Sequence, residues 1–538
     1  CALVGRTLTS TFRHGFSRMP VFKASGFFVP MRTTHIPVSP DWYTVILQTY
    51  ANREHGEVTK RSMTMGAIAR RITRVITAVV CVAVSVGVSV ATLHVPTREG
   101  GGERFNPARY RSDVIVTMFQ ANWKSVAREC GEVLGPEGVG YVQVSPPQES
   151  IQGTQWWTSY QPVSYKLDSK EGTEAEFKNM VRQCKAAGVG VIADTVINHT
   201  TGVDKTQGTG TAGSPYDNKG DFPEAGYTPS DFHAPCSIWT YRDAESVWNC
   251  QVSGLQDLDT SSPHVRDVLS DYFVKLLDYG VAGFRVDAVK HMPPEDVLAI
   301  KKLVAKKSGR SMNDIWWTQE VIGDNAEAAE IQPRNYLKTG QVNEFQYAYR
   351  LKSLFSNSLA GGSLSIKDIP QNITDSGKAS VFVTNWDTER NNMTLTYKDG
   401  DAYRLANAFM LAYPYGAPNV FSGYEFHDTD SGASGATATS VPDIDCSKDS
   451  GWSCTERWPD VHGMVGWHNV AGDAPLSDWQ DDGDNMIAFG RGGRAFIAIN
   501  NSVRTRTVTY HTALPAGEYC DVYASADCSG SVHVRFDG

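Results

Sequence analysis

The chain has 538 residues, of which 41% are hydrophobic and 20% are charged. This composition is typical of a globular protein with a large core, and the length allows about two or three domains. The formal net charge of -9 and the lack of a long basic run argue against nucleic acid or an anionic membrane as the main partner. A neutral polymer or a small solute fits this charge better.

The first part of the chain contains a segment typical of protein export. Arginines in RRITR (residues 70–74) precede an apolar run, residues 75–91, that ends in small residues as signal peptides do. We expect residues 63–91 to be a signal peptide and the mature protein to be secreted and extracellular, without stable membrane association. A signal anchor is the alternative, although the run is short for a membrane span. Residues 1–62 are expected to be upstream or propeptide sequence outside the fold.

The cysteine content agrees with export. Of ten cysteines, Cys1 and Cys81 precede the expected mature chain, which leaves an even number. Spacing alone does not determine how they pair. No C-x-x-C motif occurs, so zinc binding or thioredoxin-type chemistry has little support.

The next part of the chain alternates short β-branched runs with amphipathic helices. Strands are predicted at residues 113–119, 140–147 and 189–197, with a helix between each pair. Thr173 and Glu176 form a capping box at the start of the second helix. Such alternation predicts a parallel sheet with right-handed crossovers.

A long polar segment then interrupts the pattern. Residues 200–260 are rich in Gly, Thr, Asp and Pro, and we expect them to form a small inserted domain after the third strand. Ser262 and Pro263 start the next helix as its N-cap and first residue. The strand GFRVDAV (residues 283–289) follows, and then a helix over residues 294–307.

Later strands are predicted at DIWWTQEVI (residues 314–322), NEFQY (residues 343–347) and SVFVTNWD (residues 380–387). With about seven or eight such units, residues 105–465 fit a closed (β/α)8 TIM barrel better than an open sheet. Residues 466–538 alternate short strands with turns, which predicts a C-terminal all-β sandwich domain.

The strand GFRVDAV carries charges where a buried strand should be apolar. Side chains alternate along a strand, so Arg285 and Asp287 face away from Phe284 and Val286, into the barrel interior near its C-terminal mouth. Burying both charges unpaired would be costly. A purely structural Arg–Asp pair is therefore the alternative to an active site.

Other strand ends carry carboxylates as well. Asp194 ends one strand, Glu320 follows another, and Asp387 follows a third. Together with Asp287, these acids converge on one mouth of the barrel, which stability alone does not easily explain. Two carboxylates that face a scissile bond suit glycoside hydrolysis, one as nucleophile and one as proton donor.

The neighbours of the two central acids suggest different protonation states. Glu320 follows Trp316 and Trp317, and if either ring lines the pocket, desolvation favours the protonated acid. Asp287 stands beside Arg285 and is expected to stay ionised, as a nucleophile must. We therefore expect the two pKa values to shift in opposite directions.

Four stretches, DTVINH, GFRVDAVKH, WWTQEVI and FVTNWDTER, resemble the α-amylase family, glycoside hydrolase family thirteen, in order and spacing. The resemblance covers about residues 113–538. Three more, VQVSPPQES, WWTSYQPVSYKL and FGRGGRAFI, look closest to animal-type α-amylases and their secreted, actinobacterial-like bacterial relatives. The resemblance implies a monomeric enzyme that cleaves α-1,4-glucosidic bonds in starch, glycogen and maltooligosaccharides, endo-acting and retaining. A maltooligosaccharide-forming hydrolase or transglycosylase of the same fold is the alternative, and a non-catalytic polysaccharide-binding protein is a more distant one.

The resemblance also implies roles for single residues. Asp287 resembles the catalytic nucleophile, Glu320 the general acid/base, and Asp387 the third carboxylate, which binds sugar hydroxyls. The apolar face of a pyranose stacks well on aromatic rings, which suits Trp156 and Trp157 to sugar binding. Core packing is the alternative for each of these two tryptophans. The implied substrate-binding residues are Arg285, which orients Asp287, and His199, Lys290, His291, Trp156, Trp157, Tyr160 and Gln161.

Relatives of this kind hold a structural calcium between the barrel and the inserted domain. The matching positions are Asn198, Asp257 and the backbone carbonyls near Trp248 and at His291, and such oxygen ligands suit calcium. Asp257 has the alternative of being only a turn residue. The disulfides implied by the resemblance are Cys130–Cys184, Cys236–Cys250, Cys446–Cys454 and Cys520–Cys528.

Two departures from the family pattern affect the site. Trp386 stands where members usually carry a histidine that binds the sugar, and its presence is expected to weaken substrate binding or alter pH behaviour. Chloride-dependent members use an arginine, an asparagine and a second basic residue. Arg285 and Asn385 match the first two, but Asn419 stands at the third position, so no chloride requirement is expected.

Overall fold

A computed structural model of the chain describes residues 2–5, 112–202, 207–356, 374–483, 485–502, 504–525 and 527–536. The predicted signal peptide lies outside these residues. Among the helices of the described ranges, none combines the length and the apolar character that a membrane span requires.

The predicted barrel is confirmed: parallel strands close into a ring, with β13 hydrogen-bonded to β2. The strands are short and their residues are almost all buried, as expected for a parallel sheet covered on its outer face by helices. In chain order they are β2 (Ile115–Met118), β3 (Tyr141–Val144), β4 (Gly190–Thr195), β9 (Gly283–Val286), β10 (Trp316–Gln319), β11 (Gln341–Asn343), β12 (Ala379–Phe382) and β13 (Ala417–Ser422).

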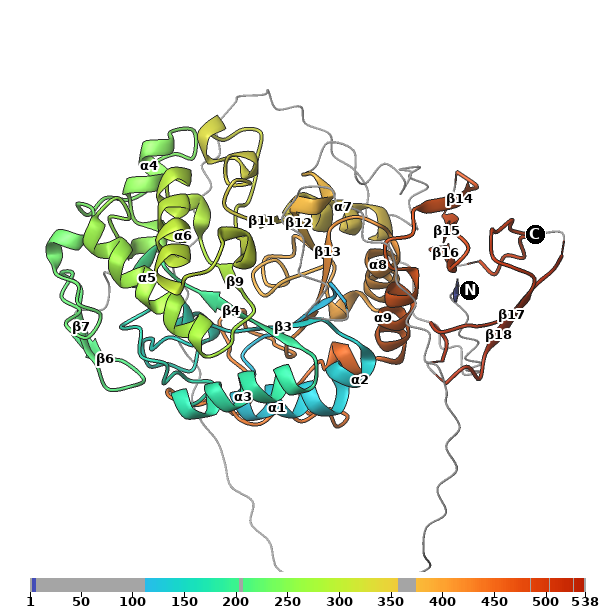
Figure 1. Cartoon of the computed structure of the whole chain (residues 1–538), viewed down its shortest axis with the longest axis horizontal. Coiled ribbons are helices and arrows are strands. Elements are labelled where there is room, and N and C mark those ends of the chain that lie inside the picture. Colours follow the sequence, from blue (N-terminus) through green and yellow to red (C-terminus); the bar gives the residue numbers. More distant parts are fainter. Residues whose placement is uncertain are drawn as a thin grey trace, which may run out of the picture. The chain divides into compact units, whose positions relative to one another are not determined.

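Helices surround these strands, and Figure 1 shows α1 beside α3 and α5 beside α6. The capping box of Thr173 and Glu176 is present at the start of α3, and Pro263 is the first residue of α5. The helix after β2 continues through a π-helical turn, Cys130–Leu134, into α2 (Gly135–Glu137). The other helices of the barrel are α1 (Trp123–Glu129), α3 (Glu174–Ala186), α5 (Pro263–Asp278), α6 (Pro294–Ser308), α7 (Phe345–Ser356), α8 (Asp401–Ala412) and α9 (Pro459–Ala471).

The strand predicted at NEFQY is wrong. Strand β11 ends at Asn343, and helix α7 begins at Phe345. The aromatic residues of NEFQY favour a strand by propensity, but Tyr347, Leu351 and Phe355 recur at helical spacing and are all buried. Packing of this helical face therefore overrides the local preference.

The inserted segment leaves the barrel at the end of β4, on the side of the strands' carboxyl ends. Strand β5 (His199–Gly202) pairs antiparallel with β8 (Leu255–Asp257), so the start and the end of the insertion are held together. Between them lie the hairpin of β6 (Gln207–Thr209) and β7 (Pro215–Asp217) and the helix α4 (Ala244–Asn249).

The C-terminal part is built of strands, as predicted. One sheet has the order β1-β16-β15-β14, and β17 pairs with β18 in a second, two-stranded sheet. Helix α9 continues past residue 466, so the strands begin only at Leu476. These strands are β14 (Leu476–Asp481), β15 (Met486–Arg491), β16 (Ala495–Asn500), β17 (Gly517–Cys520) and β18 (Ser531–Val534).

Strand β1 (Ala2–Gly5) pairs parallel with β16. We expected residues 1–62 to lie outside the fold, and these four differ from that expectation because their backbone adds an edge strand to the C-terminal sheet. The implied disulfides are confirmed: Cys130–Cys184, Cys236–Cys250, Cys446–Cys454 and Cys520–Cys528 are all formed.

Candidate active site

Arg285, on β9, lies inside the barrel with only 2% of its surface exposed. Its Nη1 donates to Asp194 Oδ1 at 2.9 Å and to Asp287 Oδ1 at 2.6 Å, and its Nη2 lies 3.1 Å from Glu320 Oε2. One buried cation thus joins carboxylates from the ends of three neighbouring strands, β4, β9 and β10. Without that cation, three buried negative charges would repel one another at close range.

The alternation predicted for β9 is confirmed. Phe284, the neighbour of Arg285, faces the helices, and its ring centroid is 4.8 Å from that of Phe273 on α5. Val286 belongs to the same buried apolar cluster. Arg285 is therefore directed inward by strand geometry, and Asp287 follows it on the same face.

Asp194 is held by more than Arg285. Its Oδ2 accepts a hydrogen bond of 2.9 Å from the hydroxyl of Tyr160, which belongs to the segment after β3. The hydroxyl of Thr195 donates to the backbone carbonyl of Arg285 at 3.0 Å. The first bond holds the Asp194 carboxylate that faces the guanidinium, and the second holds the backbone of Arg285.

Glu320 is oriented by an unusual backbone conformation. Its Oε2 accepts a hydrogen bond of 2.8 Å from the backbone N–H of Ala288. Ala288 is left-handed, with φ 50° and ψ 30°, although it is not glycine. This conformation costs roughly 1–2 kcal/mol for a residue with a Cβ. This left-handed turn directly after Asp287 points the Ala288 N–H at the Glu320 carboxylate.

Burial raises the pKa of all three central acids. It raises the pKa of Asp287 to about 6, although Arg285 acts in the opposite direction. Burial, with the charge of Asp287, also raises the pKa of Glu320. Burial and the charge of Glu320 raise the pKa of Asp387 to about 8. The expectation of opposite shifts for Asp287 and Glu320 is therefore wrong, because Arg285 is shared among several carboxylates and does not offset the desolvation of any one of them.

The two tryptophans before Glu320 do not desolvate it in the way we expected. The Trp317 ring lies 4.8 Å from that of Phe273, between the barrel and α5. The Trp316 ring lies 5.7 Å from that of Tyr141, the first residue of β3, at the opposite end of the strands from Glu320. Glu320 is instead surrounded by groups at the carboxyl end of the strands, among them Arg285 and the Ala288 amide.

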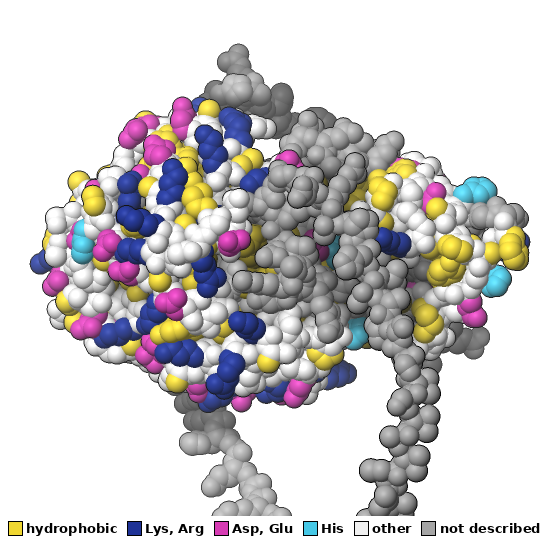
Figure 2. Space-filling view, in the orientation of Figure 1, with side chains coloured by type: hydrophobic (Ala, Val, Ile, Leu, Met, Phe, Trp, Pro, Cys, Tyr) yellow, Lys and Arg dark blue, Asp and Glu magenta, His cyan; other side chains and the backbone are white. Residues whose placement is uncertain are grey.

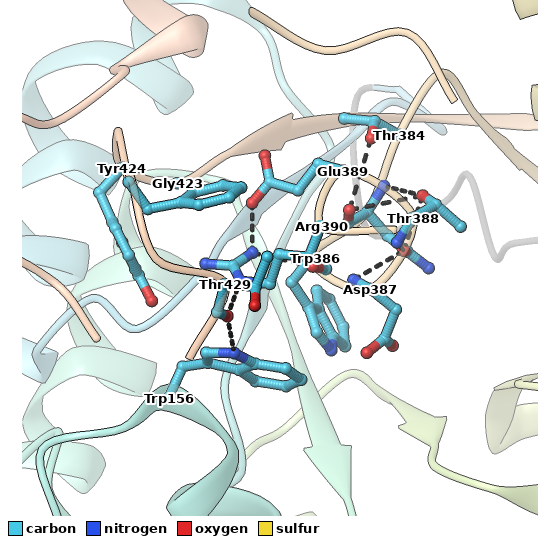
Figure 3. A network of polar contacts seen from close by, with 12 residues as sticks. Trp156, Thr384, Trp386, Asp387, Thr388, Glu389, Arg390, Gly423, Tyr424 and Thr429 are labelled. Carbon is cyan, nitrogen blue, oxygen red and sulfur yellow. Dashed lines mark hydrogen bonds and ion pairs between the residues drawn. The ribbon is translucent and has the colours of Figure 1, made fainter. Parts of the chain in front are cut away.

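Asp387 lies in a turn that follows β12. The side chain of Asn385 accepts hydrogen bonds from the backbone N–H groups of Asp387, at 3.1 Å, and Thr388, at 2.9 Å. Asn385 thereby shapes the turn, and Figure 3 shows the Asp387 carboxylate pointing away from the Glu389 side chain.

Trp386 is almost completely buried, with 3% of its surface exposed. Its ring stacks on Phe119 at 5.1 Å with an interplanar angle of 3°. The guanidinium carbon of Arg285 lies 4.8 Å from the indole. Trp386 therefore covers one side of the cation that holds the acids.

The predicted wall residues come together on the Tyr160 side. The ring centroids of Trp156 and Tyr160 are 5.8 Å apart, and His199 Nε2 lies 3.0 Å from the Tyr160 carbonyl oxygen. Burial lowers the pKa of His199 to about 4, so this ring is neutral at pH 7. Gln161 accepts a hydrogen bond of 2.9 Å from the Gly202 amide. Trp157 packs against the main core and keeps part of its surface exposed.

Lys290 and His291 lie in the short helical turn directly after β9. Lys290 donates to the Ile322 carbonyl at 2.7 Å and forms an ion pair with Glu327. Both residues contact Tyr241, whose ring lies 5.0 Å from Lys290 Nζ and 5.9 Å from the His291 ring. Sequence reasoning missed Tyr241; its place in the segment closed by Cys236–Cys250 was the available clue.

Two of the predicted metal ligands, Asn198 and Asp257, lie near each other. Pairing of β5 with β8 sets Asp257 opposite His199, next to Asn198, and the Leu258 amide donates to the Asn198 carbonyl at 3.0 Å. The side-chain oxygens Asn198 Oδ1 and Asp257 Oδ1 are buried and have no hydrogen-bond donor. Burial raises the pKa of Asp257 to about 7, although its other oxygen lies 2.7 Å from His233. Such oxygen atoms need a cation or a proton.

Figure 2 shows Lys and Arg side chains interspersed with Asp and Glu over the visible face of the described residues. This mixture does not form a single basic patch on that face, in line with the net charge of -9. It gives no support to nucleic acid as a partner.

A closed parallel barrel with carboxylates at the ends of neighbouring strands is the architecture of many glycoside hydrolases. The family model described as "Alpha amylase, catalytic domain" matches residues 142–471, and the model "Alpha amylase, C-terminal all-beta domain" matches residues 477–537. The chain therefore belongs to the α-amylase family.

Individual relatives agree with this assignment. The chain is 45% identical to the α-amylase of Streptomyces violaceus over 77% of its own length and 69% of that protein's. It is 39% identical to the α-amylase of Tenebrio molitor over 78% and 90% of the two chains. The structure is similar to that of α-amylase I from Eisenia fetida, with a TM-score of 0.74, 34% identity and coverage of 80% and 94%. A Glu-to-Gln variant of the Eisenia enzyme was solved with maltohexaose. The animal-type and Streptomyces-like resemblance is thus confirmed.

Proposed function

We propose that the protein hydrolyses α-1,4-glucosidic bonds within starch and related glucans and retains the anomeric configuration. The observation that carries this proposal is the convergence of Asp287 and Glu320 on the buried Arg285. A structural Arg–Asp pair alone would not need the second acid, or the strained Ala288 that orients it. The family membership supports the same activity.

Asp287 acts as the nucleophile. With a pKa of about 6, it is mostly ionised at pH 7, and the Arg285 contact at Oδ1 orients the carboxylate for attack on the anomeric carbon. The bond to the leaving oxygen breaks as the bond to Asp287 forms. Water then attacks the same carbon and releases the sugar from Asp287.

Glu320 acts as the general acid and base. Burial raises its pKa, so it holds the proton that the leaving oxygen takes up in the first step. In the second step the Glu320 carboxylate accepts a proton from the attacking water. The hydrogen bond from Ala288 to Oε2 orients the Glu320 carboxyl group for this exchange.

Asp387 and the wall residues hold the sugar. The raised pKa of Asp387 allows its carboxyl group to donate as well as accept hydrogen bonds to sugar hydroxyls. On one side, Trp156 and Tyr160 offer rings for stacking, and neutral His199 and Gln161 lie beside them. On the leaving side, Lys290 and His291 contact the glucan, and Tyr241 adds a ring.

We also propose that calcium binds at Asn198 and Asp257, with the backbone carbonyls of Trp248 and His291. Asn198 Oδ1 and Asp257 Oδ1, which accept no hydrogen bond, support this assignment. A divalent cation there would supply a positive counter-charge for the buried Asp257 carboxylate. A calcium ion held by these residues would link the insertion to the segment after β9 that carries Lys290 and His291. The described residues contain one cluster of Cys and Glu atoms, around Glu456, but its cysteines form a disulfide.

We propose further that the mature protein acts outside the cell as a monomer. Four formed disulfides support export, because such bonds persist in oxidising compartments. Starch, glycogen and maltooligosaccharides are the substrates that this location and the site chemistry suit.

The test is to incubate the enzyme with soluble starch and calcium and to follow iodine colour and reducing ends together. Rapid loss of colour with few new ends is expected, because internal cuts destroy the helical complex with iodine early. Glu320→Gln should lower the rate by at least about 100-fold, since it removes the acid and base. The surface variant Glu174→Gln should keep the full rate. Colour that persists while reducing ends rise would reject endo-action, and an inactive wild-type protein would reject the proposed activity.

A further inference from the structure

Arg390 lies three residues after Asp387 and has almost no exposed side chain. Its Nη1 donates to the backbone carbonyl of Trp386 at 2.8 Å, and its Nε donates to the carbonyl of Thr429 at 3.2 Å. It also forms an ion pair with its neighbour Glu389, which is itself buried (Figure 3). Arg390 is therefore a buried cation next to the catalytic acids, with a role that the proposed chemistry does not use.

Aromatic rings enclose the guanidinium group. Its carbon lies 4.3 Å from the ring centroid of Phe426, 5.2 Å from Trp156, and 5.4 Å from both Phe119 and Tyr424. The faces of such rings attract a cation. The rings restrict rotation of the planar group, so Nε and Nη1 keep their directions toward the two carbonyl oxygens.

The two carbonyls that Arg390 holds belong to different walls of the site. Trp386 O is in the peptide unit that leads directly into Asp387. Thr429 O lies on the segment after β13 and also accepts a hydrogen bond of 2.8 Å from Trp156 Nε1. Arg390 thereby connects the turn after β12, the segment after β13 and the aromatic wall after β3, as Figure 3 shows.

Stability alone does not explain this arrangement. A buried Arg–Glu pair is often no more stable than an apolar pair of similar volume, because both ions lose their water. Burial raises the pKa of Glu389 to about 7 in spite of Arg390, so the pair is not fully compensated. An apolar side chain could not donate hydrogen bonds to the carbonyls of Trp386 and Thr429. Holding these two carbonyls therefore accounts for a buried ion pair at this place.

We propose that Arg390 is a positioning residue that fixes Asp387 and Trp156 relative to each other, with Glu389 as its counter-ion. The inference rests on the proposed roles of Asp387 and Trp156 in sugar binding. Displacement of a positioned group by about 1 Å can cost on the order of 100-fold in rate. Loss of Arg390 should therefore impair both the binding of the sugar and its conversion.

The chain offers a matched control in Arg404. This arginine pairs with the buried Asp460, and its guanidinium carbon lies 4.2 Å from the ring of Trp458. It connects α8 with α9 on the outside of the barrel. Arg404→Gln thus removes an ion pair and a ring contact from a more exposed arginine, with 37% against 6% of its side chain exposed, and touches none of the site residues.

The experiment compares Arg390→Gln, Arg390→Lys and Arg404→Gln. The readouts are the melting temperature, kcat and KM on maltohexaose, and the Kd of maltohexaose measured calorimetrically in a Glu320→Gln background. Arg390→Gln should lower kcat/KM by at least about tenfold, with a loss in kcat as well as a rise in KM, and should weaken maltohexaose binding several-fold. Arg404→Gln should keep kcat/KM within about twofold, whatever its change in melting temperature.

The lysine variant separates positioning from structure. It keeps the charge, the pairing with Glu389 and the ring contacts, but it lacks the rigid fork of donors. Arg390→Lys should therefore recover the melting temperature while kcat/KM remains reduced; it also serves if Arg390→Gln does not fold. Wild-type kcat/KM in Arg390→Lys, or equal losses in Arg390→Gln and Arg404→Gln, would overturn the inference. An inactive wild-type protein would instead reject the proposed function.

Discussion

Replacement of Arg285 by lysine tests the electrostatic design of the site most directly. The guanidinium uses Nη1 for Asp194 and Asp287 and Nη2 for Glu320. A lysine has a single, compact ammonium group and cannot reproduce this fork. Arg285→Lys therefore leaves at least one of the acids without its charged donor.

The magnitude follows from the contact with Asp287. A hydrogen bond to a charged group contributes about 1.5–3 kcal/mol, which at about 1.4 kcal/mol per unit corresponds to a pKa rise of roughly two units. The pKa of Asp287 would then rise from about 6 to roughly 8. At pH 6.5 the ionised fraction would fall from about three quarters to about 3%, a loss of roughly 25-fold in kcat/KM. The sign is fixed, because loss of the charged hydrogen-bond donor to Asp287 favours the protonated acid, and the nucleophile must be ionised.

The assay is kcat/KM on maltohexaose between about pH 5 and pH 9. The acidic limb of the profile should move to higher pH in Arg285→Lys, and the deficit should shrink above about pH 8.5 as the nucleophile ionises again. Arg457→Lys is the control, because Arg457 holds both oxygens of Glu129 at 2.8 Å outside the barrel. A uniform loss at every pH, with the limb unmoved, would refute the shared-cation argument.

Three further results are expected. Removal of calcium with a chelator should lower the melting temperature by an amount equivalent to about 3 kcal/mol when calcium is otherwise at about 100 times its Kd, and Asn198→Ala should abolish this response. An equal melting temperature with and without chelator would contradict the site. Replacement of both Cys130 and Cys184 by serine should cost about 4 kcal/mol in chemical denaturation, because the bond closes a loop of 54 residues; a loss under about 1 kcal/mol would contradict this. Chloride added to desalted enzyme should leave the rate unchanged, because neutral Asn419 accepts a hydrogen bond from Thr117 where a basic residue would be needed. A several-fold rise would contradict it.

The barrel and its acids could be predicted because they depend on local pattern. Alternation along a strand places Arg285 and Asp287 inward whatever the rest of the chain does, and the ends of parallel strands meet at one mouth. The same alternation could have corrected the expectation that Trp316 or Trp317 desolvates Glu320. Trp317 has the parity of the outer face, and Trp316, four residues before Glu320, lies about 13 Å down the strand.

Shared contacts could not be predicted in this way. The pKa of Asp287 depends on how many carboxylates share the Arg285 guanidinium. These carboxylates lie at the ends of three strands, and Tyr160, which bonds Asp194, belongs to a fourth segment. The hydrogen bond from Tyr160 to Asp194, which spans 34 positions, has no signature in either segment. Arg390 was visible in FVTNWDTER, but its partner Thr429 belongs to a loop with no pattern of its own.

Trp386 shows how the chemistry can persist when a family residue is replaced. Its indole covers Arg285 and cannot take up a proton, so position 386 itself adds no cation beside the acids. The apolar ring adds to their desolvation, which favours a proton on Glu320 or Asp387 at neutral pH. Protonation of the leaving oxygen needs such a proton. What the site loses is a hydrogen bond to the sugar, because Trp386 Nε1 is buried without a partner in the described structure. The substitution should therefore affect the affinity for the glucan more than the transfer of the proton.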